Sequence, residues 1–142
     1  MNISMDKAIQ NLLNLHLARG VQPSELVDNL FDSEYIDFSL KKKNSSLVLE
    51  LSYVEELEEC SQKIFMRYTY SAEKYLNRIE QKISSGKFST QWCRNEEVTK
   101  AIAAIKNCLY QQGLSPESVN KILSTLPSDL VASVGDRLKL VA

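Results

Sequence analysis

The chain has 142 residues, 44% of them hydrophobic and 25% charged, which is typical of one globular domain of ordinary size. Its net charge of −1 excludes a strongly basic nucleic-acid coat and an acidic disordered tail. No apolar run approaches the ~18 residues of a membrane span, and the first residues lack the pattern of a signal peptide, so we expect a cytoplasmic protein.

The chemistry-bearing residues are few. Three cysteines lie far apart, at Cys60, Cys93 and Cys108, and His16 is the single histidine. They form no local metal signature, so we interpret the cysteines as buried reduced thiols and keep a zinc site or a reactive thiol as the alternative. No spacing arranges a catalytic set, and we therefore predict no metal, no cofactor and no enzymatic activity.

The N-terminal part is predicted to be helical. Apolar residues recur at helical spacing over Ser4 to Arg19, with Ser4 as the cap and Gly20 as the stop. Pro23 then suits the first turn of a second short helix that reaches Phe31.

The period changes to two over residues 35–53, which predicts a small β-hairpin. Ile36, Phe38 and Leu40 alternate with polar residues, and a second alternating run follows the polar segment 42–45. The lysines of that segment are interpreted as a solvated turn that discourages aggregation along the edge. An anion contact is the alternative interpretation.

Residues of about 53–85 are predicted to form one long central helix. Apolar side chains recur there at spacings of three, four or seven, and Gly86 can end the helix. The segment Thr69-Tyr70-Ser71 is the weak point, because its residues favour other conformations and could divide the helix. The residues that form the apolar stripe are Val54, Leu57, Ile64, Tyr68, Ala72, Tyr75, Ile79 and Ile83.

Beyond an irregular segment 87–95, whose Trp92 we expect in the core, a firm helix is predicted over 95–112. Gly113 ends that helix, and Ser115-Pro116 begins the next. A last short helix over 127–134 and a docking apolar tail over 138–141 complete the prediction.

Two corners share glycine, an apolar residue, a polar residue and proline: Gly20 to Pro23, and Gly113 to Pro116. Each glycine is expected to have positive φ. The apolar, glycine and turn positions of 105–124 also resemble the helix-turn-helix of DNA-binding regulators. This resemblance implies DNA contacts from Lys106, Ser115, Ser118, Asn120 and Lys121, although one acid, Glu117, offsets the base of the second helix.

On the predicted central helix, five bases project into one strip: Lys63, Arg67, Lys74, Arg78 and Lys82. Like charges at this spacing repel, so something acidic should lie opposite them. The candidates are solvent and salt, the acidic N-terminal region of this or a second subunit, and a nucleic acid or acidic protein.

The sequence therefore predicts a mainly α fold: a single-domain helical bundle over 1–142, built around the helix at about 53–85, with the hairpin at about 35–53 at its edge. The expected function is that of a non-enzymatic protein-interaction or regulatory protein. We expect it to act as a homodimer, because the stripe of the long helix is too wide for its short neighbours to cover. The alternative is a DNA-binding transcriptional regulator that uses the segment at about 105–124. No small-molecule substrate and no membrane partner are expected.

Overall fold

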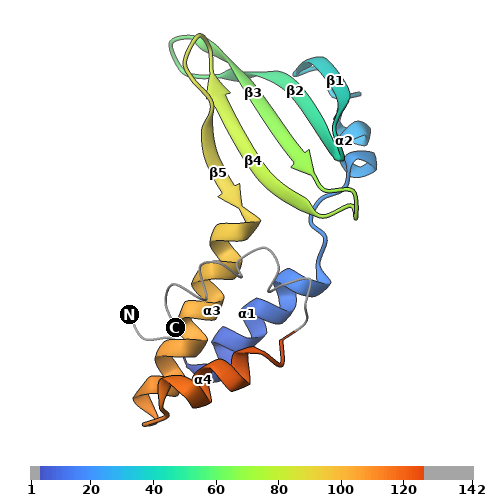
Figure 1. The fold of residues 1–142 in the computed structure, drawn as a ribbon. Coiled ribbons are helices and arrows are strands. Elements are labelled where there is room, and N and C mark those ends of the chain that lie inside the picture. Colours follow the sequence, from blue (N-terminus) through green and yellow to red (C-terminus); the bar gives the residue numbers. More distant parts are fainter. Residues whose placement is uncertain (1–3, 127–142) are drawn as a thin grey trace. The chain divides into compact units, whose positions relative to one another are not determined.

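The computed structural model describes residues 4–126, which form four helices and a five-stranded sheet (Figure 1). By its contacts the chain divides into two compact units. The sheet unit holds residues 19–94; the helical unit holds the described residues 4–18 and 95–126. The prediction of one domain over 1–142 stays a prediction. The elements are α1 (Met5–Leu17), α2 (Pro23–Asn29), β1 (Tyr35–Lys43), β2 (Ser46–Glu56), β3 (Ser61–Tyr70), β4 (Leu76–Ile83), β5 (Ser89–Cys93), α3 (Arg94–Gln111) and α4 (Pro116–Leu123).

The prediction of a mainly α bundle is wrong, because the structure is an α+β fold with an antiparallel sheet in the order β1-β2-β3-β4-β5. The predicted hairpin is confirmed as β1 and β2, but the expected central helix is the end of β2 followed by β3 and β4. Spacings of four fit one helical face and also one face of a strand, since four is a multiple of two. β-branched and aromatic side chains, dense from Ile64 to Tyr70, favour the strand. The segment 87–95, expected to be irregular, contains β5.

The register gives the sheet two distinct faces. Leu49 is opposite Tyr68, and Leu51 is opposite Met66, so these side chains share one side of the sheet. We call this side the apolar face; it belongs to a cluster that also contains Leu47, Tyr53, Tyr70, Leu76, Ile79 and Trp92. The alternate residues form the charged face, which carries Glu50, Phe65, Arg67, Arg78, Glu80 and Lys82.

The apolar face is anchored to the segment before α2. The Tyr70 hydroxyl donates a hydrogen bond to the Val21 carbonyl at 2.7 Å, and the Leu76 N–H donates to the Arg19 carbonyl at 2.8 Å. Gly20 has φ +89°, and a Cβ there would lie 2.8 Å from the Leu76 Cβ. The predicted positive φ is therefore confirmed at this corner, and close approach to β4 is a second reason for glycine.

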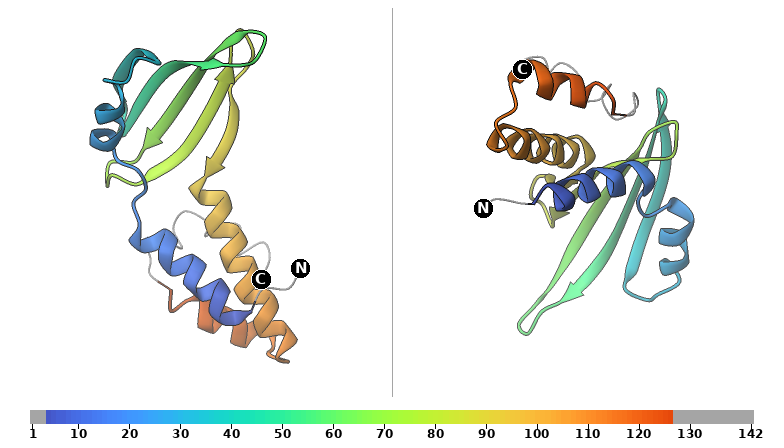
Figure 2. Two further views of the ribbon diagram at one scale, coloured as in Figure 1. Left: turned by 180° about the vertical axis from the view of Figure 1, so that it is seen from behind. Right: turned by 90° about the horizontal axis from the view of Figure 1, so that it is seen from below.

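In the helical unit, α1, α3 and α4 enclose one apolar core (Figure 2). Ser4 caps α1, and its hydroxyl accepts a hydrogen bond from the Lys7 N–H at 3.2 Å. Gly113 has φ +88°, which confirms the second corner. The buried residues of this core are Ala8, Leu12, Val98, Ala101, Ile102, Ile105, Leu109, Val119 and Leu123.

Other predictions have mixed outcomes. Cys93 and Cys108 are buried thiols as expected, but Cys60 is exposed, which contradicts the prediction there. Trp92 is only half-buried, at the side of the apolar cluster. The predicted helix at 127–134 and the tail at 138–141 lie outside the described residues.

Candidate protein-binding site

The open edge of the sheet is β1, the first strand in the sheet order, which pairs on one side only among the described strands (Figure 1). Three large apolar side chains of β1 are exposed: Ile36 by 49%, Phe38 by 41% and Leu40 by 48%. Phe38 is opposite Leu51 and Leu40 is opposite Leu49, so both extend the apolar face beyond its buried part. An edge strand that exposes apolar side chains can bind another strand.

The other edge, β5, differs from β1 in length and in the polarity of its exposed residues. It has five residues where β1 has nine. Its exposed residues are the polar Ser89, Thr90 and Gln91, and the register shifts where it pairs with β4. Short, polar and irregular edges are the usual protection against an added strand. β1 has only a register shift near Ile36 and the lysines at its end.

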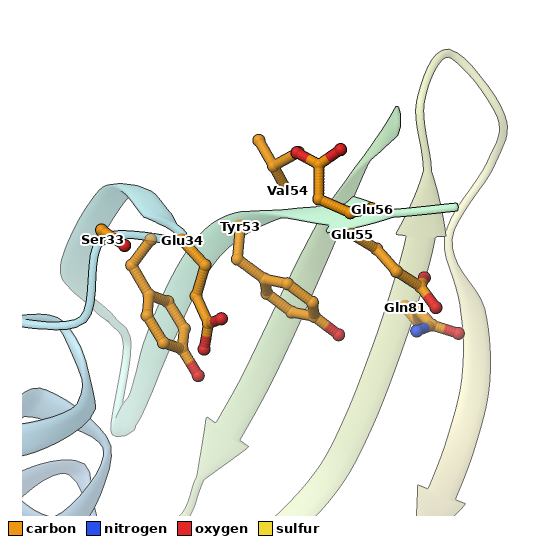
Figure 3. A pocket seen from close by; sticks show the side chains of 8 residues that line it. Ser33, Glu34, Tyr53, Val54, Glu55, Glu56 and Gln81 are labelled. Atoms are coloured by element: carbon orange, nitrogen blue, oxygen red, sulfur yellow. The ribbon is translucent and has the colours of Figure 1, made fainter. Parts of the chain in front are cut away.

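A hollow of about 920 Å³ lies at the end of the β1–β2 pair (Figure 3). Figure 3 shows the side chains of Tyr53, Glu34 and Glu55 on one side of β2, and those of Val54 and Glu56 on the other side. The lining residues are Ser33, Glu34, Tyr35, Tyr53, Val54, Glu55, Glu56 and Gln81. The lining therefore carries three carboxylates and no basic side chain.

The two tyrosines of the hollow remain neutral hydrogen-bond donors. Their rings are tilted at 55°, with centroids 5.6 Å apart. Burial raises the pKa of Tyr35, and the charge of Glu34 adds to this effect. Burial likewise raises the pKa of Tyr53, with a further contribution from Glu55. Aromatic rings beside carboxylates suit a positively charged side chain of a partner.

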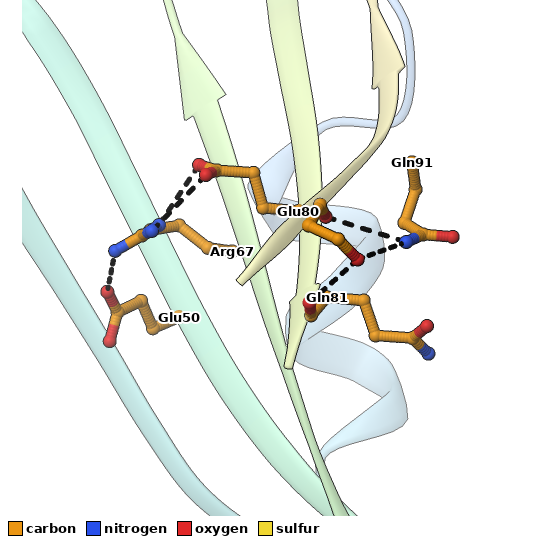
Figure 4. Close-up of polar contacts among 6 residues, drawn as sticks. Glu50, Arg67, Glu80, Gln81 and Gln91 are labelled. Carbon is orange, nitrogen blue, oxygen red and sulfur yellow. Dashed lines mark hydrogen bonds and ion pairs between the residues drawn. The ribbon is translucent and has the colours of Figure 1, made fainter. Parts of the chain in front are cut away.

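The charged face carries a ladder of ion pairs across three strands (Figure 4). The Arg67 Nε and Nη2 donate to the two carboxylate oxygens of Glu80 at 3.1 and 3.2 Å. The Arg67 Nη1 lies 3.5 Å from a carboxylate oxygen of Glu50. The hydrogen bond to Glu80 is the main reason that the pKa of Arg67 is raised.

Cations on this face also cover aromatic rings. The Arg67 guanidinium lies 3.8 Å from the centroid of Phe88. The Lys82 and Lys63 amines lie 4.4 and 5.0 Å from the centroid of Phe65. Cations of the same chain therefore cover part of both rings, and Phe65 and Phe88 are half-buried.

The predicted basic strip is on the sheet rather than on a helix. Lys63 and Arg67 of β3 and Arg78 and Lys82 of β4 share the charged face, whereas Lys74 lies in the β3–β4 turn with φ +71°. Part of the expected acidic counterpart is intramolecular, because Arg67 pairs with Glu50 and Glu80, and Lys63 lies 3.7 Å from Asp37. A partner-binding role for these bases stays a prediction.

The residues of the DNA-binding alternative lie on α3, α4 and the turn between them. Lys106 is only 4% exposed, so its charge is not available to a phosphate backbone in this conformation. The Ser115 hydroxyl caps α4 by accepting a hydrogen bond from the Ser118 N–H at 3.3 Å. Asn120 and Lys121 are exposed. One accessible lysine on α4 is a weak basis for phosphate binding.

The sequence was enough to predict that β1 is a strand. It was not enough to predict that this strand lies at the edge of the sheet, because that depends on the strand order. Alternation identified the strand, and the lysines were visible as a run. Nothing local indicates which strand of a sheet lies at the edge, because that is fixed by the pairing of β2 with β3.

Comparison with known proteins identifies no relative: no family model, curated protein or solved structure matches this chain. Within residues 4–126, no group of three or more histidine, cysteine or acidic residues could hold a metal ion. None of the helices in that range is both long and apolar enough to cross a membrane.

Proposed function

We propose that this chain is a non-enzymatic protein-binding domain that receives its partner along β1. The observation that carries the proposal is the exposure of Phe38 and Leu40 on a nine-residue edge strand, whose protective features are a register shift near Ile36 and the lysines at its end. An added strand would satisfy the outward N–H and C=O groups of β1 and cover both side chains. Completing the burial of two large apolar side chains stabilises a complex by about 1–3 kcal/mol. A cytoplasmic location remains part of the proposal.

Photo-crosslinking tests this function in cells that make the protein. The photoreactive residue p-benzoylphenylalanine replaces Phe38 in one variant and the exposed Thr90 of β5 in a matched control. We expect a discrete protein adduct at position 38 and none at position 90, because, of the two edge strands, only β1 exposes large apolar side chains. No adduct at position 38, or equal adducts at both positions, would contradict the proposal.

A parallel measurement addresses the DNA-binding alternative. Fluorescence anisotropy of a random duplex is recorded with the wild-type chain at low and moderate salt. We expect no binding, because Lys106 is buried and the acid of Glu117 offsets Lys121 on α4. Salt-sensitive binding at micromolar concentration would instead favour a DNA-binding regulator.

A further inference from the structure

We infer that the partner along β1 is a second copy of this chain, paired antiparallel through β1 with Ser39 at the two-fold axis, an inference that rests on the proposed protein-binding function. The predicted homodimer had its basis in a long helix that the structure replaces with strands. The homodimer is now inferred from β1, because the charges and the side-chain sizes along this strand suit pairing with a second copy of itself.

Charge along the β1 edge is strongly asymmetric. Three acidic residues lie just before β1 or in its first half: Asp32, Glu34 and Asp37. Three basic residues end the strand: Lys41, Lys42 and Lys43. All six are exposed. Asp37 lies 3.7 Å from Lys63 but its side chain remains 74% exposed, so it can face a second cation. Antiparallel pairing brings the acidic end of one strand near the basic end of the other, whereas parallel pairing brings like charges together.

The register centred on Ser39 pairs Phe38 and Leu40 with apolar residues and Asp37 with a lysine, while Ile36, at the register shift, lies opposite Lys42. Residues whose numbers sum to 78 then lie opposite each other. Phe38 meets Leu40 of the other copy, and Asp37 meets Lys41, each twice by symmetry. The regular part of β1, from Asp37 onward, contains both of these pairs, and the register shift lies outside it.

The same register keeps the two faces of the sheet continuous. Phe38 and Leu40 lie on the side of Leu51 and Leu49, so their pairs extend the apolar face. Asp37 and Lys41 lie on the other side, so their pairs extend the charged face. The result is a ten-stranded sheet built from two copies of the five-stranded one, with an isologous interface that closes and cannot propagate into a fibre.

Neighbouring registers match less well. Centred on Phe38, the pairing puts Phe38 opposite itself, but the Ile36–Leu40 pair then falls at the register shift, and Asp37 lies opposite the uncharged Ser39. Centred on Leu40, the pairing puts Leu40 opposite itself and Asp37 opposite Lys43, but Phe38 then lies opposite Lys42. A shift by one residue would place side chains of opposite faces together. Only the Ser39-centred pairing puts both Phe38 and Leu40 opposite apolar residues and also puts Asp37 opposite a lysine.

Charge reversal with mixing tests this register in the full chain. Sedimentation velocity at low and high salt, from micromolar to hundreds of micromolar protein, is expected to show a monomer–dimer equilibrium for the wild type. Asp37→Lys and Lys41→Asp should each weaken the dimer about tenfold at low salt, because two cross-strand pairs become like-charged. An equimolar mixture of the two variants should restore association, since every pair between unlike copies is again opposite in charge. Glu73→Lys, an exposed change in the β3–β4 turn, should leave the equilibrium unchanged.

The mixing step also controls for folding, because misfolded variants could not restore one another. A wild type that stays monomeric at all concentrations would overturn the inference, and so would a dimer that ignores both reversals. The proposed function fails separately: a crosslinked adduct with a different protein at position 38 keeps that function and removes only the self-pairing, whereas the absence of any adduct removes both.

Discussion

The two faces of the sheet are built from alternate residues of the same strands, yet they contribute differently. On β2, Leu49 has 0% exposure on the apolar face, while the neighbouring Glu50 is half-exposed on the charged face and pairs with Arg67. Burial of apolar area is the larger stabilising term, and partly exposed ion pairs contribute little. The apolar face therefore determines whether the unit folds, whereas the charged face tolerates change.

The largest expected effect is on the apolar face. Leu49→Ala should lower the free energy of unfolding by about 2–5 kcal/mol, because it removes buried apolar area and leaves a cavity that the surrounding residues fill only in part. Val48→Ala, one residue along on the charged face and half-buried, should cost about 1 kcal/mol or less. Urea denaturation of both variants gives the difference. Similar losses would mean that the two faces are equally important for folding.

The anchor of the apolar face should have an intermediate effect. Tyr70→Phe removes the hydrogen bond to the Val21 carbonyl and leaves that acceptor without this donor, which should cost about 1 kcal/mol. Thermal unfolding measures this loss. The exposed Tyr110 supplies the control, since Tyr110→Phe should change stability little.

The same tyrosine links the stability of the sheet unit to alkaline pH. Burial raises the pKa of Tyr70 from 10.0 to about 12. The native state therefore keeps a proton that the unfolded chain loses, so the contribution is complete below pH 10.0 and falls as pH rises toward about 12. The decrease of stability across this window should be shallower in Tyr70→Phe than in the wild type. An identical decrease would show that Tyr70 is not the buried group responsible.

Local signals predicted a large part of the fold. Caps and breakers located α1, α2, α3 and α4, since Ser4, Pro23, Gly113 and Ser115 act through the adjacent backbone alone. Period-two alternation identified β1 and β2 for the same reason. These features need no knowledge of the rest of the chain.

The error over 53–85 has a physical cause. Ile64, Tyr68 and Ile79 fit a helical stripe, and the apolar Met66 and Tyr70 between them also fit strand alternation, so the pattern was ambiguous. The strand is selected by pairing with β2, which places the buried Leu49 opposite the half-buried Tyr68. Such pairing is non-local and leaves no signature within the segment. The candidate edge was missed for the same reason.

The smallest effect should come from the charged face, where a double-mutant cycle separates the two partners of Arg67. Glu80 accepts two hydrogen bonds and its side chain is 16% exposed, whereas Glu50 makes one longer contact and is 47% exposed. Combining Arg67→Met with Glu80→Gln should therefore give a coupling energy of about 1 kcal/mol, and combining it with Glu50→Gln about 0.3 kcal/mol. High salt should reduce the coupling energy to Glu50 more than the coupling energy to Glu80, because screening acts most on exposed pairs. Urea denaturation of the six proteins at low and high salt measures both couplings. A coupling to either carboxylate as large as the loss in Leu49→Ala would contradict the ranking of the two faces, since the charged ladder would then be as important for folding as the apolar core.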